Sequence, residues 1–222
     1  MDSWLFLQNQ LLPALFEGLI VTLQLIALSA PFGLLTGTLI AVGRTYGDRN
    51  LSFLCQLYVI FFKGCPLLLL LFIIYFGLPS LGISFSPFFA SVLGFILCNG
   101  AYSSEYIRGA IQSVKTGQIL AAQALGMTKW QGVFFIILPQ AFRRALPGVG
   151  NEIIYLIKYS SLAHIITCIE LTGAGKIVAA RTFRFTETFA VIGLIYLLLV
   201  SIATQLLRWL EKRTSYPGME RG

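Results

Sequence analysis

The sequence predicts an all-α protein that crosses a membrane several times. Hydrophobic residues make up 57% of its 222 positions and charged residues only 11%, whereas a soluble domain carries about 25% charged residues. The apolar residues also fall in runs near the roughly 20 residues that one membrane-spanning helix needs. These runs lack the polar–apolar alternation of a membrane β-barrel, so helices are the structure expected for them.

Five such runs follow one another in what we expect to be a single domain over residues 1–222. The first run contains one charge, Glu17, the second contains only Lys63, and the last contains none. The fourth contains Glu152 and Lys158 together with the single histidine of the chain. We therefore expect about five transmembrane helices, at residues 12–43, 52–78, 86–108, 147–169 and 188–210.

The distribution of lysine and arginine predicts an N-terminus outside and a C-terminus in the cytoplasm. Eleven of the 16 basic residues, Arg221 among them, fall at residues 44–49, at 108–144 or after residue 207, and placing these segments inside follows the positive-inside rule. The segments left outside hold only Lys176, Arg181 and Arg184. Membrane topology thus accounts for most of the net charge of +7, and no nucleic-acid partner is expected.

Residues 114–146 are expected to form a cytoplasmic loop. The loop is predicted to contain two short helices, at residues 117–126 and 127–138, and to break at Pro139. Two threonines stand where they can cap these helices, Thr116 and Thr128.

The first of these two helices is more suited to a protein partner than to a lipid surface. A helix lying on lipid carries Lys and Arg along its polar face, but Gln118 and Gln123 occupy that face here. Docking into a groove of a partner protein is therefore the preferred interpretation.

Small residues recur at helical spacing in the first span: Ser29, Gly33, Gly37 and Ala41. Such a row lets another helix approach closely. It is consistent with a contact to a second subunit or a gate, and also with packing inside the chain, which we favour.

Several stretches resemble the membrane-spanning permeases of ABC importers for polar amino acids, of the histidine, glutamine or arginine type. AAQALG with the later LPQA resembles their EAA loop, in which a coupling helix sits in a cleft of the cytoplasmic ATPase. The matching stretches follow the family's order: FFKGCPLL at 61–68, YFGLP at 75–79, AYSSEYIRG at 101–109, AAQALG at 121–126, LPQA at 138–141, residues 151–162 with KYSSL at their end, and EL at 170–171.

The resemblance implies a type I ABC importer permease fold and a transport subunit that couples to its ATPase through residues 117–139. The residues implied in ATPase coupling are Leu120, Ala121, Ala122, Ala124, Leu125, Gly126 and Trp130. The family's acidic loop residue is replaced by Leu120. Lys63 stands where the family tends to have arginine, which keeps the charge but loses the bidentate fork.

The implied partners are two ABC ATPase subunits, a second permease copy or close homologue, and an extracellular or periplasmic amino-acid-binding protein. These partners and the surrounding lipid place the chain in a prokaryotic cytoplasmic membrane. Transport would proceed by alternating access. No cofactor is expected in this chain, because ATP and Mg²⁺ would be bound by the ATPase.

Two charges at membrane depth are candidates for holding an amino acid. Charges there are costly and are functional candidates by default. Lys158 suits a carboxylate and Glu17 an ammonium group; structural alternatives are a Glu17 that reaches the surface and a Lys158 paired with Glu152 or Glu105. Further candidates for the substrate site are Tyr159, Ser160 and Ser161, with Asn99, Tyr102 and Lys63 as weaker ones. Residues expected to be structural or to form a gate are Lys63, Pro66, Glu105, Arg108 and Pro139.

Two other classes of function are less consistent with the sequence. An ion-coupled secondary transporter or channel would show inverted repeats and acidic residues in mid-membrane, and no convincing repeat is present. A membrane enzyme would need paired carboxylates, a metal cluster or a Ser/His/Asp set, and none is evident. GAGK at residues 173–176 is followed by Ile177 and does not complete a nucleotide-binding loop. ATP hydrolysis is therefore expected in a separate chain, and no metal site is expected.

Overall fold

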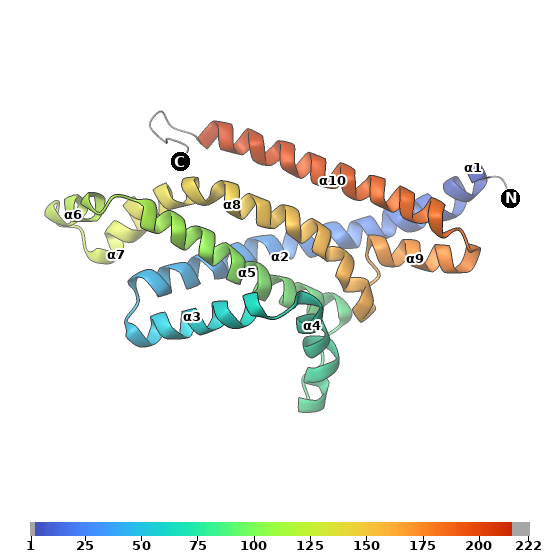
Figure 1. The fold of residues 1–222 in the computed structure, drawn as a ribbon, viewed down its shortest axis with the longest axis horizontal. Coiled ribbons are helices and arrows are strands. Elements are labelled where there is room, and N and C mark those ends of the chain that lie inside the picture. Colours follow the sequence, from blue (N-terminus) through green and yellow to red (C-terminus); the bar gives the residue numbers. More distant parts are fainter. Residues whose placement is uncertain (1–2, 215–222) are drawn as a thin grey trace.

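The computed structural model describes residues 3–214, and the elements within them are helices, as predicted (Figure 1). Arg221, counted above among the cytoplasmic basic residues, lies outside the described part. The short helix α1 (Ser3–Phe6) lies at one end of the long axis, and the last turns of α10 (Phe185–Thr214) lie toward the other (Figure 1). This arrangement suits an odd number of passes; the direction in which the chain sits in the membrane remains a prediction.

The helices follow in order along the chain. A π-helical turn (Leu7–Leu11) joins α1 to α2 (Leu12–Tyr46), and α3 (Arg49–Gly64) and α4 (Leu67–Phe72) come next. Short π and 3₁₀ turns (Ile73–Gly77 and Leu78–Leu81) lead from α4 toward α5. The remaining helices are α5 (Pro87–Ser113), α6 (Gly117–Ala124), α7 (Lys129–Gly132), α8 (Leu138–Tyr159), α9 (Leu171–Thr182) and α10.

Two helical segments are each long and apolar enough to cross a membrane, Trp4–Tyr46 and Phe185–Thr214. Two bent pairs of helices raise the number to as many as four if each pair is one span. The predicted span 86–108 coincides with α5, a helix of 27 residues that is not among these candidates. The expected number of about five spans therefore remains a prediction.

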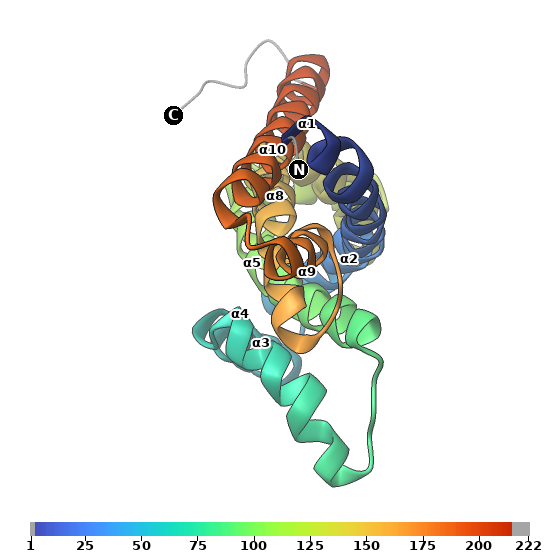
Figure 2. The ribbon, with the colours of Figure 1, turned by 90° about the vertical axis from the view of Figure 1, so that its right-hand side faces the viewer.

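The second predicted span is not one straight helix. The chain bends by 102° between Arg49–Gly64 and Leu67–Leu81, so a continuous helix over residues 52–78 is wrong. Pro66 explains the break, because proline disfavours helical backbone at the preceding residue, and Cys65 is indeed extended (φ −83°, ψ 125°). The segment after the break turns away from the long axis of the bundle (Figures 1 and 2), and its first turns pack against α5.

Pro139 does not break the chain where the sequence predicts. From Lys129 the helix runs through a π-helical turn (Val133–Ile137) directly into α8. The wider π turn ends just before Pro139, whose missing N–H falls at the start of α8, where proline is tolerated. The helix that contains the predicted fourth span therefore begins before residue 147, and the bounds of the loop and of the span in the membrane stay a prediction.

The row of small residues on α2 packs within the chain. α2 lies along α5, and a Cβ built on Gly33 would come within 3.1 Å of the Cβ of Asn99. A Cβ on Gly37 would lie 2.8 Å from that of Ser103. Of the two interpretations of this row, the internal one is confirmed.

Replacing Gly37 with leucine is expected to destabilise the fold by about 3 kcal/mol, because overpacking a close helix contact forces the backbones apart. The midpoint of thermal unfolding in detergent measures the loss. Gly193→Leu is the matched control, since a Cβ on that α10 residue meets nothing within 4 Å. Equal losses in the two variants would contradict the contact described here.

Candidate functional site: a charged cleft and an exposed hairpin

A cleft opens where α3 breaks from α4 and faces α5 and α8. Its volume is about 450 Å³, enough for a small molecule. The break itself supplies one wall, since residues 63–68 all line the cleft. The opposite wall consists of Cys98, Tyr102, Tyr159 and Leu162.

A second, much smaller hollow adjoins the cleft and reaches the buried carboxylate of Glu152. The two share four lining residues: Leu67, Cys98, Tyr102 and Tyr159. The small hollow extends to Asn99 on α5 and to Glu152 on α8, and its volume of about 10 Å³ is about the least that holds one water molecule.

Glu152 is one of two acidic side chains buried among residues 3–214; the other is Glu170. The Glu152 side chain is 6% exposed. The Tyr106 hydroxyl donates to its carboxylate. A buried carboxylate is costly unless its oxygens are well satisfied, and an ionised carboxylate can accept several hydrogen bonds. Glu152 therefore has capacity left for a ligand in the hollow.

Lys63 stands at the open side of the same cleft. Its ammonium lies 5.5 Å from the centre of the Tyr102 ring, and it interacts electrostatically with Glu152. Among the described ion pairs, none joins Lys63 to Glu152 within 4.0 Å. The cleft thus holds one positive and one negative group that influence each other without touching.

The structure brings together only part of the predicted substrate set. Asn99, Tyr102 and Tyr159 line the cleft or its hollow, and so do Lys63 and Pro66, which were expected to be structural. The hydroxyls of Ser160 and Ser161 instead donate to backbone carbonyls in their own turn.

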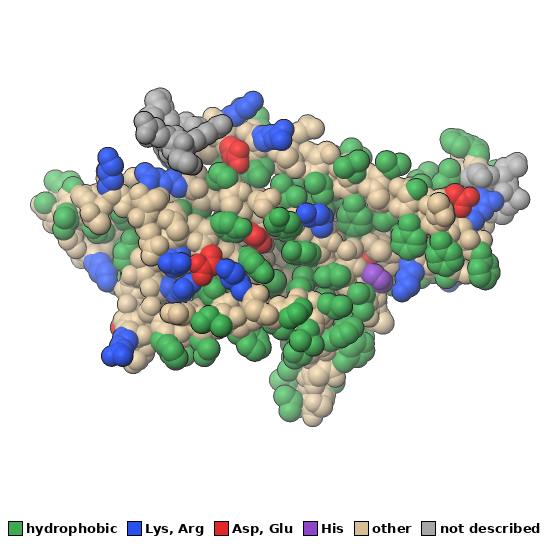
Figure 3. Space-filling model, viewed as in Figure 1, with side chains coloured by type: hydrophobic (Ala, Val, Ile, Leu, Met, Phe, Trp, Pro, Cys, Tyr) green, Lys and Arg blue, Asp and Glu red, His purple; other side chains and the backbone are tan. Residues whose placement is uncertain are grey.

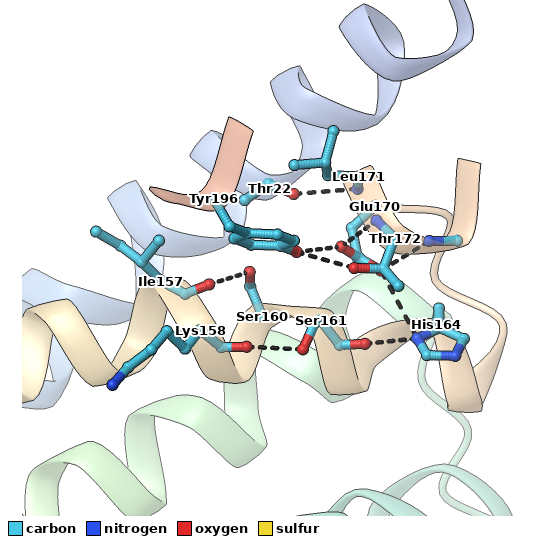
Figure 4. Close-up of polar contacts among 11 residues, drawn as sticks. Thr22, Ile157, Lys158, Ser160, Ser161, His164, Glu170, Leu171, Thr172 and Tyr196 are labelled. Atoms are coloured by element: carbon cyan, nitrogen blue, oxygen red, sulfur yellow. Dashed lines mark hydrogen bonds and ion pairs between the residues drawn. The ribbon is translucent and has the colours of Figure 1, made fainter. Parts of the chain in front are cut away.

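The two charges that were predicted to hold the substrate lie outside the cleft lining. The Lys158 ammonium is 4.2 Å from the centre of the Tyr155 ring. Figure 4 shows this side chain pointing away from a polar cluster around Glu170. Glu17 is exposed on α2. Glu152, which the sequence suggested only as an ion-pair partner of Lys158, is the acidic group in the cleft.

That polar cluster is centred on Glu170, whose side chain is 0% exposed (Figure 4). Its carboxylate accepts from the backbone N–H groups of Thr172 and Gly173 and from the hydroxyl of Tyr196, each at 2.9 Å. The Thr22 hydroxyl on α2 accepts from the next backbone N–H, that of Leu171, at 3.2 Å. Glu170 thus caps α9 and ties it to α10.

Sequence reasoning included Glu170 only in a matching stretch after the fourth span and gave it no structural role. In the structure it directly precedes α9, which packs against α2 and α10. An acidic residue directly before a helix is a capping signal, and that signal was available in the sequence.

At the opposite end of the molecule, α6 and α7 form a hairpin. Thr128 caps α7 in a capping box with Gln131, as predicted for that threonine, whereas the Thr116 side chain makes no capping bond. Gly126 adopts a left-handed conformation (φ +82°) between the two helices, which glycine does at little cost. Figure 3 shows more Lys and Arg side chains over the half of this face that carries α6 and α7 than over the other half.

The predicted coupling residues separate into two faces of α6. Leu120, Ala121, Ala124 and Leu125 are exposed, and their spacing places them on one side of the helix. Leu125 is the most prominent, with 84% of its surface exposed. Ala122 is on the other side, 4% exposed, where it lies close to Gly132. Gly126 and Trp130 follow at the exposed turn and at the start of α7.

Two basic side chains tie the hairpin region to the ends of long helices. Lys129 donates to the carbonyl of Tyr46 at the end of α2, at 3.0 Å. Arg144 donates to the carbonyl of Ser113 at the end of α5. Cations at the carbonyl ends of helices are favourable, and these contacts connect α7 and α8 with α2 and α5.

Glu105 and Arg108, which were expected to be structural or to form a gate, make an ion pair on one face of α5, at 2.9 Å. The sequence did not indicate that Arg44 on α2 joins them through the other oxygen of Glu105. This cluster connects the same ends of α2 and α5.

A family model described as "Binding-protein-dependent transport system inner membrane component" matches residues 6–216. Among curated proteins, the chain is 40% identical over 204 residues to the probable amino-acid ABC transporter permease YckA of Bacillus subtilis, covering 92% of this chain and 90% of that one. It is 34% identical to the glutamine transport system permease GlnP of Escherichia coli, covering 91% and 93%.

Solved structures show the same architecture. A chain from a crystal structure of an amino acid ABC transporter with histidines superposes with a TM-score of 0.86 at 33% identity, covering 96% of this chain and 99% of that one. A chain of the MetNI methionine ABC transporter, in an inward-facing conformation, gives 0.77 at 19% identity, covering 97% and 100%, which is a likeness of fold alone.

Proposed function

This chain belongs to the family of binding-protein-dependent transport system inner membrane components, and we propose that its cleft carries an amino acid across the membrane. The chain is the membrane subunit of a binding-protein-dependent importer and is not itself an enzyme. The relatives named for amino-acid and glutamine transport support an amino acid as cargo.

The observation that carries this assignment is the buried Glu152 carboxylate opening into the cleft. Burying a carboxylate inside a membrane protein costs several kcal/mol, and Glu170, the other buried carboxylate of the described chain, is satisfied by three hydrogen bonds. An ammonium group bound in the hollow would supply what Glu152 lacks. Lys63 at the open side then suits the carboxylate of the same molecule. The pair of residues proposed to hold the amino acid is therefore Lys63 and Glu152, in place of Lys158 and Glu17.

We propose that the exposed face of α6 binds the ATPase. The face is apolar and small, as a helix seated in a groove requires. Lys129 links the hairpin to α2, and Arg144 links α8, which continues from α7, to α5, the helix that bears Asn99 and Tyr102. Movement imposed on α6 would thus reach the cleft and switch its access between the two sides. ATP and Mg²⁺ would bind the ATPase.

The complete importer would contain two such membrane subunits, identical or closely related, two ATPases and an external binding protein. Its place would be a prokaryotic cytoplasmic membrane, with the α6–α7 hairpin inside. The bacterial relatives support this location.

Replacing Lys63 with methionine is expected to lower amino-acid uptake at least tenfold, because the cargo carboxylate would lose its charged partner; tenfold corresponds to about 1.4 kcal/mol. The measurement is ATP-driven uptake into proteoliposomes that contain the complete importer. Lys158→Met is the matched control and is expected to retain uptake. Loss in Lys158→Met with normal uptake in Lys63→Met would restore the assignment made from sequence, and uptake without ATP would point to an ion-coupled transporter.

A further inference from the structure

The cleft and its adjoining hollow together are lined by one ammonium and one carboxylate. Of the four charged residue types Lys, Arg, Asp and Glu, the described lining of the cleft and hollow contains Lys63 and Glu152. The charges closest in sequence are engaged elsewhere: Lys158 lies over Tyr155, and Glu105 is held by Arg44 and Arg108. The cleft and its hollow therefore have a formal charge near zero, divided into two separate poles.

The hollow and the adjoining cleft suit two oppositely charged groups of one small molecule. The hollow at Glu152 has room for about one water-sized group, and an ammonium is of that size. Lys63 belongs to the open cleft of about 450 Å³. Between the poles lie the four shared residues, none of which is Lys, Arg, Asp or Glu.

A charged side chain on the cargo would find no partner in this lining. Moving a charge from water into an apolar site without a partner is costly. A cationic side chain near Tyr102 would also meet Lys63, which already lies over that ring. An anionic side chain would compete with the cargo's own carboxylate for Lys63.

We infer that this cleft selects amino acids of zero net charge, with Lys63 binding the α-carboxylate and Glu152 the α-ammonium. The inference rests on the proposed function and narrows its cargo to zwitterions with an uncharged side chain. Selection by the cleft is separate from selection by the external binding protein, so it is measured without that protein.

The experiment measures equilibrium binding of radiolabelled amino acids to the permease–ATPase complex in nanodiscs. The probes are pairs of similar size: glutamine with glutamate, asparagine with aspartate, and methionine with lysine. The neutral member of at least one pair is expected to bind at least tenfold more tightly than its charged counterpart. Tighter binding of lysine, aspartate or glutamate than of the neutral partners, or no binding by any probe, would overturn the inference.

A second set of measurements assigns each charge to its pole. The best-binding amino acid is compared with its α-carboxamide, which lacks the negative charge. The change is expected to weaken binding at least tenfold in the parent and in Lys63→Arg, but less than twofold in Lys63→Met. A second analogue lacks the α-ammonium. It is expected to bind at least tenfold more weakly than the amino acid in the parent, but less than twofold more weakly in Glu152→Gln. Discrimination that persists in Lys63→Met and Glu152→Gln would overturn the roles of these residues.

Uptake by the complete importer distinguishes a failure of zero-charge selection from a failure of the proposed function. ATP-driven uptake of a cationic or anionic amino acid by this cleft would leave the proposed function in place and reject zero-charge selection. Absence of ATP-driven uptake of any amino acid would reject the proposed function itself.

Discussion

Replacing Leu125 with aspartate is expected to reduce ATP-driven uptake at least tenfold while leaving the protein folded. Leu125 is 84% exposed at the end of α6, so the substitution removes no internal packing. If this face sits in an apolar groove of the ATPase, a carboxylate there must be desolvated, at a cost of about 2 kcal/mol or more. Uptake and ATP hydrolysis, measured together in proteoliposomes, report the coupling.

Gln123→Asp provides the matched control for Leu125→Asp. Gln123 is exposed on the flank of the same helix, so the variant carries the same new charge outside the proposed contact, and its uptake is expected to stay near that of the parent. Ala122, also among the implied coupling residues, is not suitable for this test, because its side chain packs inside the hairpin. Normal uptake in Leu125→Asp would exclude the face as the ATPase contact.

Replacing Glu170 with alanine is expected to destabilise the chain by about 3 kcal/mol. The change removes the cap of α9, worth about 1 kcal/mol, and takes the acceptor from the buried Gly173 N–H and from the Tyr196 hydroxyl, each costing about 1–3 kcal/mol. The Tyr196 hydroxyl keeps Thr172 Oγ1 as a neighbour at 3.1 Å, which limits the loss. Thermal unfolding of the purified protein in detergent measures the effect.

Glu187→Ala is the control for Glu170→Ala. Glu187 is exposed in the first turn of α10, where its loss is expected to cost only about 0.5 kcal/mol through the helix dipole. If Glu170→Ala melted no lower than Glu187→Ala, the hydrogen bonds around Glu170 would not be stabilising the junction of α9 and α10.

The course of the helices was partly predictable from local signals. The long apolar run of the first span and the run near the C-terminus both correspond to long helices, α2 and α10. Two prolines in similar apolar surroundings behave differently, however: the chain bends at Pro66 and continues through Pro139. The difference lies in the π turn before Pro139, whose wider hydrogen-bonding pattern sequence spacing does not reveal.

The candidate site was less predictable than the helices. Sequence reasoning named Asn99, Tyr102 and Tyr159, which do line the cleft or its hollow. It preferred Lys158 to Lys63 because Lys158 interrupts an apolar helix. Neighbouring positions on a helix point about 100° apart, so Lys158 can face away from a cleft that Tyr159 lines.

By itself, the sequence determined that this protein is a helical membrane protein of the importer type, and it placed the proposed docking segment at the residues that form α6. Those properties depend on composition, run length and short motifs, which are local. Only the tertiary structure decided which charges lie around one cleft and its hollow, because that depends on how α3 and α8 pack against α5 and on the bend at Pro66. These contacts between distant segments place Lys63 and Glu152, 89 positions apart in the sequence, around one cleft.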